Sequence, residues 1–238
     1  MKPGDPAAVR DLFEAVAPHY DLLNDLLSLG LHRLWKRQAV HWLRPRPGQR
    51  LLDLCCGTGD LALLLAARVR PRGEVLGLDA AAAPLAVARR RGEALPWLPL
   101  RWQQGDALAT GLADGSRDGA VMAYGLRNLA DPAAGLRELR RVLRPGGRAA
   151  VLDFRHIDPA AGGLEALRER FQRLYLRHLV VPTARVAGLE AEYAYLEKSL
   201  ERFPHGQQLV DLARRAGFSR VAHRPLAAGL MGLLELQA

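Results

Sequence analysis

The chain has 238 residues, of which 49% are hydrophobic, and it carries a formal net charge of +9. These values suit one globular domain with a large core and exclude a disordered chain. The only cysteines, Cys55 and Cys56, are adjacent, which excludes a normal disulfide, and no Cys/His set has zinc spacing. The N-terminus lacks the apolar core of a signal peptide, and no apolar run is long enough to span a membrane. We therefore expect a cytoplasmic protein, whose positive charge raises the question of a nucleic acid or an anionic membrane as partner.

Helices are expected before the first strand, from about residue 7 to residue 43. The first is indicated by apolar residues at helical spacing, namely Val9, Leu12, Phe13 and Val16, and Pro18 ends it. Such a prefix cannot belong to the sheet, so residues 1–47 are expected to form a lid over the mouth of the site. Four residues of the second helix are expected to form a solvated face rather than a ligand site: His32, Arg33, Lys36 and Arg37.

The pattern of a nucleotide site follows this prefix. Leu51–Leu54 is an apolar run typical of a buried strand, and a helical pattern begins at Leu61. The turn between them contains Gly57, Thr58 and Gly59. Glycine tolerates positive φ angles and holds no side chain against a ligand, and a helix N-terminus presents unpaired N–H groups.

The turn differs from the dinucleotide fingerprint because carboxylates flank its glycines, Asp53 before them and Asp60 after them. Two acids disfavour a pyrophosphate and suit a cationic ligand such as S-adenosylmethionine. The second strand, Glu74–Leu78, is followed by Asp79, about 20 residues after Gly59, where this fold class places an acceptor for the ribose hydroxyls. The alternative is an ordinary strand–helix–strand turn with a chance acid.

Three further strands alternate with helices after this unit. The third strand, Leu100–Gln104, ends at Asp106 and Ala107, which could contact an adenine ring; a local helix cap explains Asp106 equally well. The fourth and fifth strands are expected at 119–124 and 149–154, with a helix from Asp131 and a sharp turn at 144–147 between them. This alternation predicts an α/β fold with a doubly wound parallel sheet, whose ligands bind along the carboxyl ends of the strands.

The last third of the chain changes rhythm. Residues 161–203 contain two helical stretches, which we expect to form a cap insertion over the strand ends. A last sheet helix at 206–216 and a terminal hairpin, 218–223 and 230–236, complete the sheet. No repeat or linker divides the chain, so residues 1–238 are expected to form a single domain.

Four segments carry a family resemblance: 20–25, 30–37, Tyr124–Asn128, and 193–196 with Ser199. Over nearly its whole length the chain resembles the quinone-biosynthesis C-methyltransferases of the ubiquinone/menaquinone type. It is most similar to their cyanobacterial and chloroplast branch, the 2-phytyl-1,4-naphthoquinone methyltransferases, through Asp53–Gly57, Tyr124 and Gly229–Gly232. The resemblance implies a class I, Rossmann-like methyltransferase with a mostly parallel seven-stranded sheet.

The resemblance also implies site residues. The family's S-adenosylmethionine contacts fall on Thr58, Asp79, Asp106 and Ala107, and a further serine contact falls on Ala123, which has no hydroxyl. It implies methylation of the reduced naphthoquinone ring, demethylphylloquinol to phylloquinol. The alternatives are demethylmenaquinol and a polyprenyl methoxybenzoquinol.

Five residues are candidates for the chemistry. Arg127 is expected to stabilise the phenolate of the quinol, directly or through a water, with Asn128 orienting it. Asp153 and His156 are alternative proton acceptors, and a loop or helix cap explains either one equally well. Tyr20 could position the ring from the lid, and neither a metal nor a flavin is implied.

The expected substrate is a prenylated or phytylated naphthoquinol. Because the tail cannot be drawn into water, we expect transient contact with an anionic membrane surface, with helices at 22–43 and 164–200 forming the doorway. The sequence is also compatible with a homodimer. The rival hypothesis is a cofactor-binding, RNA-associated protein, prompted by the charge; the 6% aromatic content and its placement in lid and core patterns argue against a nucleic-acid partner.

Overall fold

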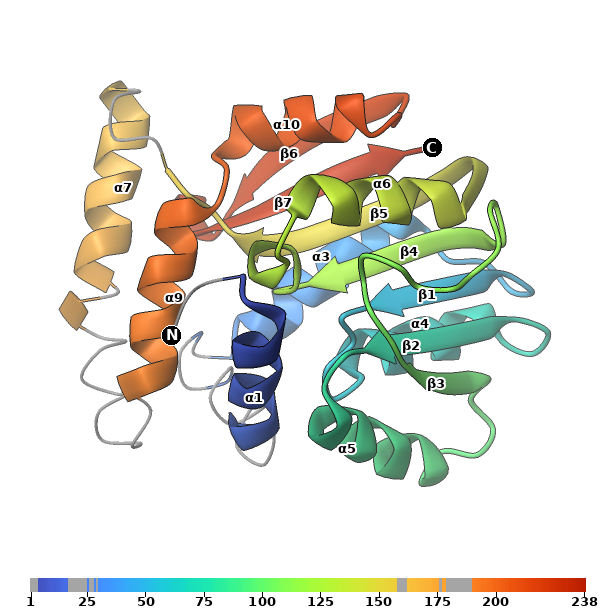
Figure 1. Cartoon of the computed structure of the whole chain (residues 1–238). Coiled ribbons are helices and arrows are strands. Elements are labelled where there is room, and N and C mark those ends of the chain that lie inside the picture. The colour runs from blue at the N-terminus through green and yellow to red at the C-terminus, as the bar shows by residue number, and fades with distance from the viewer. Residues whose placement is uncertain are drawn as a thin grey trace.

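The structure is a computed structural model that describes residues 4–16, 25, 28, 30–157, 162–175, 177, 178 and 190–238. Its centre is one seven-stranded sheet with the strand order β3-β2-β1-β4-β5-β7-β6 (Figure 1). The strands are β1 (Arg50–Leu54), β2 (Glu74–Asp79), β3 (Leu100–Gln104), β4 (Arg117–Ala123), β5 (Leu143–Phe154), β6 (Arg220–Leu226) and β7 (Met231–Gln237). β1 to β5 are parallel, and β7 runs antiparallel between β5 and β6. The doubly wound, mostly parallel sheet expected from the sequence is therefore confirmed.

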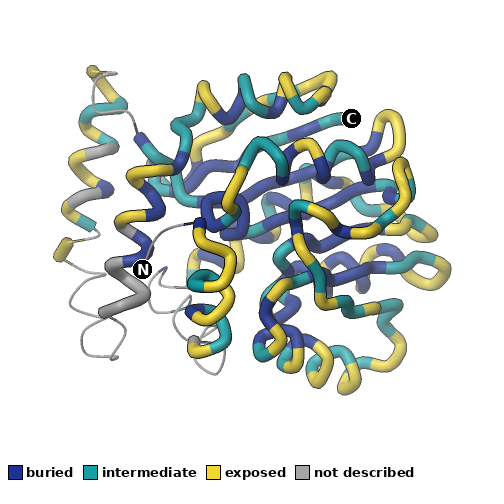
Figure 2. The backbone as a smooth tube through the Cα atoms, in the orientation of Figure 1, coloured by how far each residue is buried: buried dark blue, intermediate teal, exposed yellow. Residues whose placement is uncertain are grey.

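Helices cover both faces of this sheet. The first face is covered by α3 (His32–Leu43) and α4 (Asp60–Val69), and the second by α6 (Pro132–Val142) and α10 (Gly206–Arg215) (Figure 1). In β1, Leu51 packs into the first core while Leu52 and Leu54 pack into the second. Successive side chains of a strand point to opposite faces, so a strand covered on both sides is apolar throughout. Figure 2 shows this as a buried centre within an exposed rim.

A local sequence signal explains where α6 begins. Asp131 caps α6 by accepting a hydrogen bond from the Ala134 N–H at 3.0 Å, with proline at the first position of the helix. The turn expected at 144–147 lies inside β5 rather than before it: Leu143 pairs with Arg117 and Arg148 with Gly119, so the four residues between them bulge out of the ladder. The terminal turn is also shorter than expected: β6 continues to Leu226, and only Ala227–Gly229 forms a 3-10 turn before β7.

Three further helices of the described part lie near the carboxyl ends of the parallel strands (Figure 1). α1 (Pro6–Val16) contacts α5 (Ala82–Glu93), and α9 (Glu190–Arg202) contacts the 3-10 turn η1 (Leu126–Asn128). α7 (Gly163–Tyr175) lies at the edge of the molecule beside the β6–β7 turn (Figure 1). Of the prefix expected to form a lid, α1 lies at the strand ends, whereas α3 packs into the core through Trp35, Val40 and Leu43. Among the described residues, no helix is both long and apolar enough to cross a bilayer.

Candidate functional site

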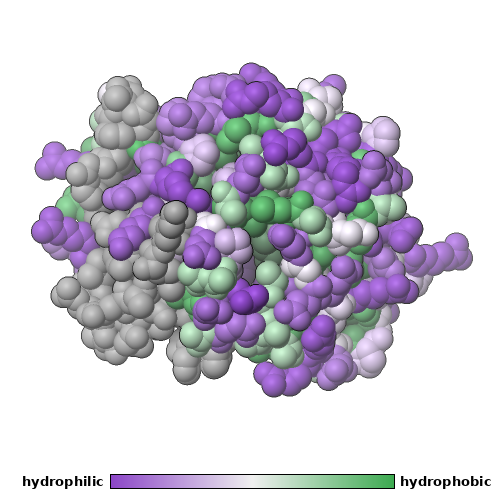
Figure 3. Space-filling view, viewed as in Figure 1, coloured by the Kyte–Doolittle hydropathy of each residue, from purple (hydrophilic) through white to green (hydrophobic). Residues whose placement is uncertain are grey.

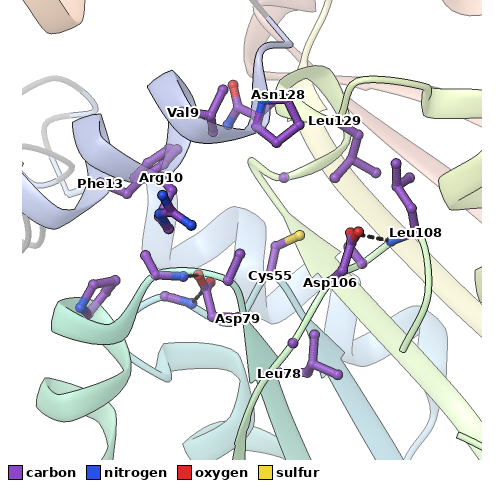
Figure 4. A pocket seen from close by; sticks show the side chains of 18 of the residues that line it. Val9, Arg10, Phe13, Cys55, Leu78, Asp79, Asp106, Leu108, Asn128 and Leu129 are labelled. Carbon is purple, nitrogen blue, oxygen red and sulfur yellow. Dashed lines mark hydrogen bonds between the residues drawn. The ribbon is translucent and has the colours of Figure 1, made fainter. Parts of the chain in front are cut away.

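A cavity of about 570 Å³ opens at the carboxyl ends of β1 to β4. Cys55, Asp79 and Asp106 line it from the sheet side, and Val9, Arg10 and Phe13 face it from α1 (Figure 4). In the space-filling view hydrophobic side chains gather near the middle of the molecule, with hydrophilic ones above, below and to the right of them (Figure 3). The volume is in the range of cofactor and small-molecule sites, and the cavity lies at the edge of the sheet where open α/β folds bind ligands.

The glycine turn after β1 has two different functions. Gly57 lines the cavity with a φ of 53°, so the backbone there is open to a ligand. Gly59 caps α4 with a φ of 87°, and a Cβ on it would lie 2.6 Å from the Trp102 ring. Gly59 therefore serves the packing of α4 against β3. Thr58 is buried beside it and, unlike Gly57, is not part of the cavity lining.

Asp79 ends β2 at the floor of the cavity. Its carboxylate oxygens accept hydrogen bonds from the Gly57 N–H at 2.8 Å and the Ala81 N–H at 2.9 Å. Burial raises the pKa of Asp79, and these two N–H groups oppose the rise. A carboxylate accepts about four hydrogen bonds, so Asp79 can still accept from a ligand in the cavity.

Asp106 and Ala107 form the opposite wall of the cavity. Asp106 accepts a hydrogen bond from the Leu108 N–H at 2.8 Å, which stabilises the turn after β3. No helix begins at Asp106 in the described residues 100–125, so the helix cap weighed in the sequence is wrong; Asp106 closes a turn and also lines the cavity. Ala107 is buried in the same lining.

The two acids that flank the glycine turn have other partners. Asp53 is fully buried and accepts a hydrogen bond from the Ala62 N–H at 2.8 Å. Burial raises the pKa of Asp53 to about 8, so it is largely neutral at pH 7. Burial also opposes ionisation of Asp60, but Lys36 and Arg91, each 2.7 Å away, outweigh it and lower the Asp60 pKa to about 2. Neither acid presents an unpaired negative charge to a cationic ligand, which corrects that part of the sequence argument.

Lys36 and His32 correct a second expectation. Both side chains are buried rather than solvated, because Lys36 pairs with Asp60 and His32 lies 2.8 Å from Asp25. Arg33 and Arg37 are exposed, as expected for a solvated face, although Arg33 pairs with Asp25 at 2.7 Å.

Arg127 and Asp153 form a buried ion pair beside the cavity. Nη1 of Arg127 lies 2.8 Å from Asp153 Oδ1, and the Arg127 backbone N–H donates to Asp153 Oδ2 at 3.2 Å. The guanidinium carbon of Arg127 lies 5.3 Å from the Phe154 ring centroid. Its buried Nε has no hydrogen-bond partner among the residues that the structure describes. Two candidates named separately in the sequence are thus one unit.

Asn128 connects this unit to the cavity, which it lines. Its amide donates to the Tyr124 carbonyl at 2.8 Å, and its oxygen accepts from the Tyr195 hydroxyl at 3.1 Å. Tyr124 has a φ of 60°, which is strained for a residue with a side chain. Such strain is typical of functional sites, and here it lies just after the end of β4. Tyr195, which belongs to the cap region, therefore orients Asn128 from α9.

The other two chemical candidates lie apart. Nδ1 of His156 lies 2.5 Å from the Phe203 carbonyl oxygen, which fixes the ring against the start of the segment before α10. Among the described residues Nε2 of His156 has no hydrogen-bond partner. Neither His156 nor the Arg127–Asp153 pair is part of the cavity lining. Tyr20 lies outside the described residues.

The sequence did not single out Glu14 or Arg10. The carboxylate of Glu14 accepts hydrogen bonds from the Ala82 and Ala83 N–H groups at 2.5 and 2.7 Å, and so caps α5 from another helix. The N-cap residue of α5, Ala81, makes no side-chain cap of its own. The spacing of Arg10 and Glu14, four residues apart on the helix that carries Phe13, was the available signal.

The comparisons with known proteins agree with this geometry. The chain matches the model of the ubiE/COQ5 methyltransferase family over residues 1–234. It is 52% identical over 235 residues to a 2-phytyl-1,4-naphtoquinone methyltransferase of Synechococcus elongatus, with 98% of each chain covered. The chloroplastic 2-phytyl-1,4-beta-naphthoquinone methyltransferase of Arabidopsis thaliana is 41% identical over 228 residues, which cover 94% of this chain and 85% of that one.

Solved structures of more distant proteins share the fold. A SAM-dependent methyltransferase from Aquifex aeolicus superposes with a TM-score of 0.62 at 16% identity, covering 98% of both chains. One from Thermotoga maritima gives 0.63 at 21% identity, covering 95% of this chain and 98% of that one. At such identities the likeness concerns the fold alone, and it confirms the expected class I methyltransferase architecture. Because the family model matches residues 1–234, the chain belongs to the ubiE/COQ5 methyltransferase family. It is a methyltransferase that uses S-adenosylmethionine, as the sequence predicted.

Proposed function

We propose that this enzyme methylates a ring carbon of a phytylated naphthoquinol, converting demethylphylloquinol to phylloquinol with S-adenosylmethionine as methyl donor. The observation that carries the substrate is the 52% identity over 98% of the chain to a 2-phytyl-1,4-naphtoquinone methyltransferase. The cavity at the strand ends, with Asp79 on its floor, supports the cofactor.

The residues present fit this cofactor. Asp79 would accept from both ribose hydroxyls, Asp106 and Ala107 would contact the adenine edge, and Gly57 leaves space for the methionine part. When bound, S-adenosylmethionine supplies an electrophilic methyl group. The chain's own contribution is to hold the ring in line with this methyl group and to exclude water from the closed site.

The acceptor must be the reduced ring, because a quinone carbon is electrophilic whereas a quinol carbon ortho to a phenolate is electron-rich. Arg127 would stabilise that phenolate, since its Nε is a buried donor without a partner among the described residues. Asn128, held by Tyr195, would orient the ring at the cavity wall.

For the proton acceptor we favour His156 over Asp153. The two oxygens of Asp153 already accept from Arg127 Nη1, the Arg127 N–H and the Phe154 N–H. His156 is oriented by the Phe203 carbonyl and leaves Nε2 to take a proton. The ring carbon loses its hydrogen as a proton after the methyl group has bonded, so the base acts last.

The substrate tail determines where the enzyme works. About twenty apolar carbons, each worth about 0.8 kcal/mol in a bilayer, cannot be transferred to water. We therefore propose a cytoplasmic enzyme that docks peripherally on the membrane and admits only the ring. A homodimer is a separate prediction that analytical ultracentrifugation tests, and an RNA shift assay across salt tests the absence of a nucleic-acid partner.

The proposal is tested with labelled S-adenosylmethionine and a panel of reduced quinones with matched tails. Demethylphylloquinol should be methylated with the highest kcat/KM, and the oxidised quinone should not react. A preference for demethylmenaquinol or for the methoxybenzoquinol would replace the proposed substrate with that one. Loss of label transfer to every quinol would reject quinol methylation itself.

A further inference from the structure

α7 exposes an apolar stripe on the outside of the molecule. Four large side chains form this stripe: Leu164 at 61% exposure, Leu167 at 64%, Phe171 at 47% and Leu174 at 49%. They are spaced three or four residues apart, so they share one face of the helix. Figure 1 places α7 at the edge of the molecule, away from α5 and β3.

Polar side chains attach α7 to the protein. Glu165 pairs with Arg155 at 2.7 Å and also with Arg168. Gln172 is buried and donates to the Arg155 carbonyl at 2.9 Å. The face turned toward the sheet is therefore held by hydrogen bonds and ion pairs, while the neighbouring face leaves four large apolar side chains in water. This distribution is the reverse of that in an ordinary surface helix.

Basic residues border the stripe. Arg170, one turn from both Leu167 and Leu174, is exposed, and so is Arg177 beyond the end of the stripe. Apolar side chains edged by arginines are typical of helices that lie in the interface of an anionic membrane. A symmetric contact between two copies would bring the arginines of both stripes into one interface, where like charges repel.

We propose that α7 is the membrane-docking element, with Leu164, Leu167, Phe171 and Leu174 inserted among lipid acyl chains and Arg170 and Arg177 on anionic headgroups. The reason for docking, access to the quinol, rests on the proposed function. The docking itself does not, because vesicle binding is measured without substrate. The assignment also places the entrance for the quinol ring. α7 contacts the β6–β7 turn, which lies at the same edge of the sheet as the carboxyl ends of the parallel strands.

The test is flotation of the full chain with phosphatidylcholine vesicles, with and without phosphatidylglycerol. Leu167→Ser combined with Phe171→Ser should lower partitioning to anionic vesicles by about 10-fold or more. Trp97→Ser, which removes an apolar side chain of 56% exposure before β3, is the matched control and should bind like wild type. Arg170→Gln with Arg177→Gln should remove the preference for phosphatidylglycerol, whereas Arg89→Gln with Arg90→Gln on α5 should keep it.

Two controls keep the outcomes distinct. The serine variants should retain wild-type Tm and wild-type methyl transfer to a short-tailed naphthoquinol in water, so a loss of binding reports the surface and not the fold. Absence of methyl transfer in wild type would reject the proposed function and leave the docking result standing. Equal vesicle binding by the Leu167/Phe171 variant and wild type would overturn the docking proposal. So would a wild-type dimer that this variant converts to monomers, because the stripe would then belong to a second copy.

Discussion

Arg127 and Asp153 lie 2.8 Å apart at the ends of neighbouring strands, and each is less than a tenth exposed. The pair joins the turn after β4 to the end of β5, on the route between the cavity and the cap helix α9. Removing one partner of a buried ion pair leaves the other charge uncompensated, which is strongly destabilising. Catalytic and structural effects of Arg127 must therefore be separated by experiment.

Arg127→Ala should lower kcat steeply and should also lower the free energy of unfolding, by about 3–5 kcal/mol. The double variant Arg127→Ala with Asp153→Asn removes both charges, so it should recover much of the stability without recovering kcat. Denaturant unfolding and single-turnover methyl transfer measure the two effects. Recovery of kcat in the double variant would assign Arg127 a purely structural role.

Asp79→Ala should weaken S-adenosylmethionine binding by about 2–4 kcal/mol, because the ribose hydroxyls lose a buried charged acceptor. Since the Gly57 and Ala81 N–H groups donate to different oxygens of Asp79, Asp79→Asn keeps one of these two hydrogen bonds and is the milder change. Isothermal titration calorimetry measures the affinities. If Asp79→Ala bound the cofactor as tightly as wild type, the ribose assignment would be wrong.

Glu14→Ala should weaken cofactor binding by about 1–2 kcal/mol, roughly 5- to 30-fold, because α1 loses the two hydrogen bonds that hold it against the N-terminus of α5. Glu14→Gln keeps one acceptor oxygen and should fall between wild type and alanine. The control is Asp11→Ala, on the same helix with its side chain 73% exposed, which should bind normally. An effect of Asp11→Ala equal to that of Glu14→Ala would point to general loss of α1 helicity instead.

His156→Asn should retain the hydrogen bond to the Phe203 carbonyl, because the asparagine amide reaches the position of Nδ1. It removes the base at Nε2, so kcat should fall while the KM for cofactor stays near that of wild type. Because a general base must be unprotonated to act, the fall of kcat toward acid pH should disappear in this variant. A variant with an unchanged pH profile would return the role of proton acceptor to Asp153.

Asp53 should make stability depend on pH. Its folded pKa of about 8 lies above the ordinary value of 3.8, so between about pH 4 and pH 8 the folded protein binds a proton that the unfolded chain has lost. Wild-type stability relative to Asp53→Asn should therefore fall as pH rises through this window, by up to about 1.4 kcal/mol per pH unit. Urea unfolding of both proteins from pH 5 to pH 9 measures the difference. A constant difference would show that Asp53 is ionised throughout.

The sequence alone determined the elements whose signals are local. Leu51–Leu54 is a short apolar run, which is typical of a strand buried on both faces. Gly57 and Gly59 form the turn after it, where φ is positive. The interval to Asp79 follows from the length of one helix between two parallel strands. These features depend on periodicity, on turn chemistry and on chain length, which a sequence displays directly.

Only the tertiary structure decided which polar groups meet. Lys36 reaches Asp60 across 24 residues, Arg127 reaches Asp153 across 26, and Glu14 reaches Ala82 across 68. Sequence periodicity does not identify the partner of a charged side chain. Its role therefore depends on how the helices pack on the sheet. The same holds for α7, whose apolar and polar faces are visible in the sequence. Which of those faces turns outward depends on the contacts of Glu165 and Gln172 with Arg155.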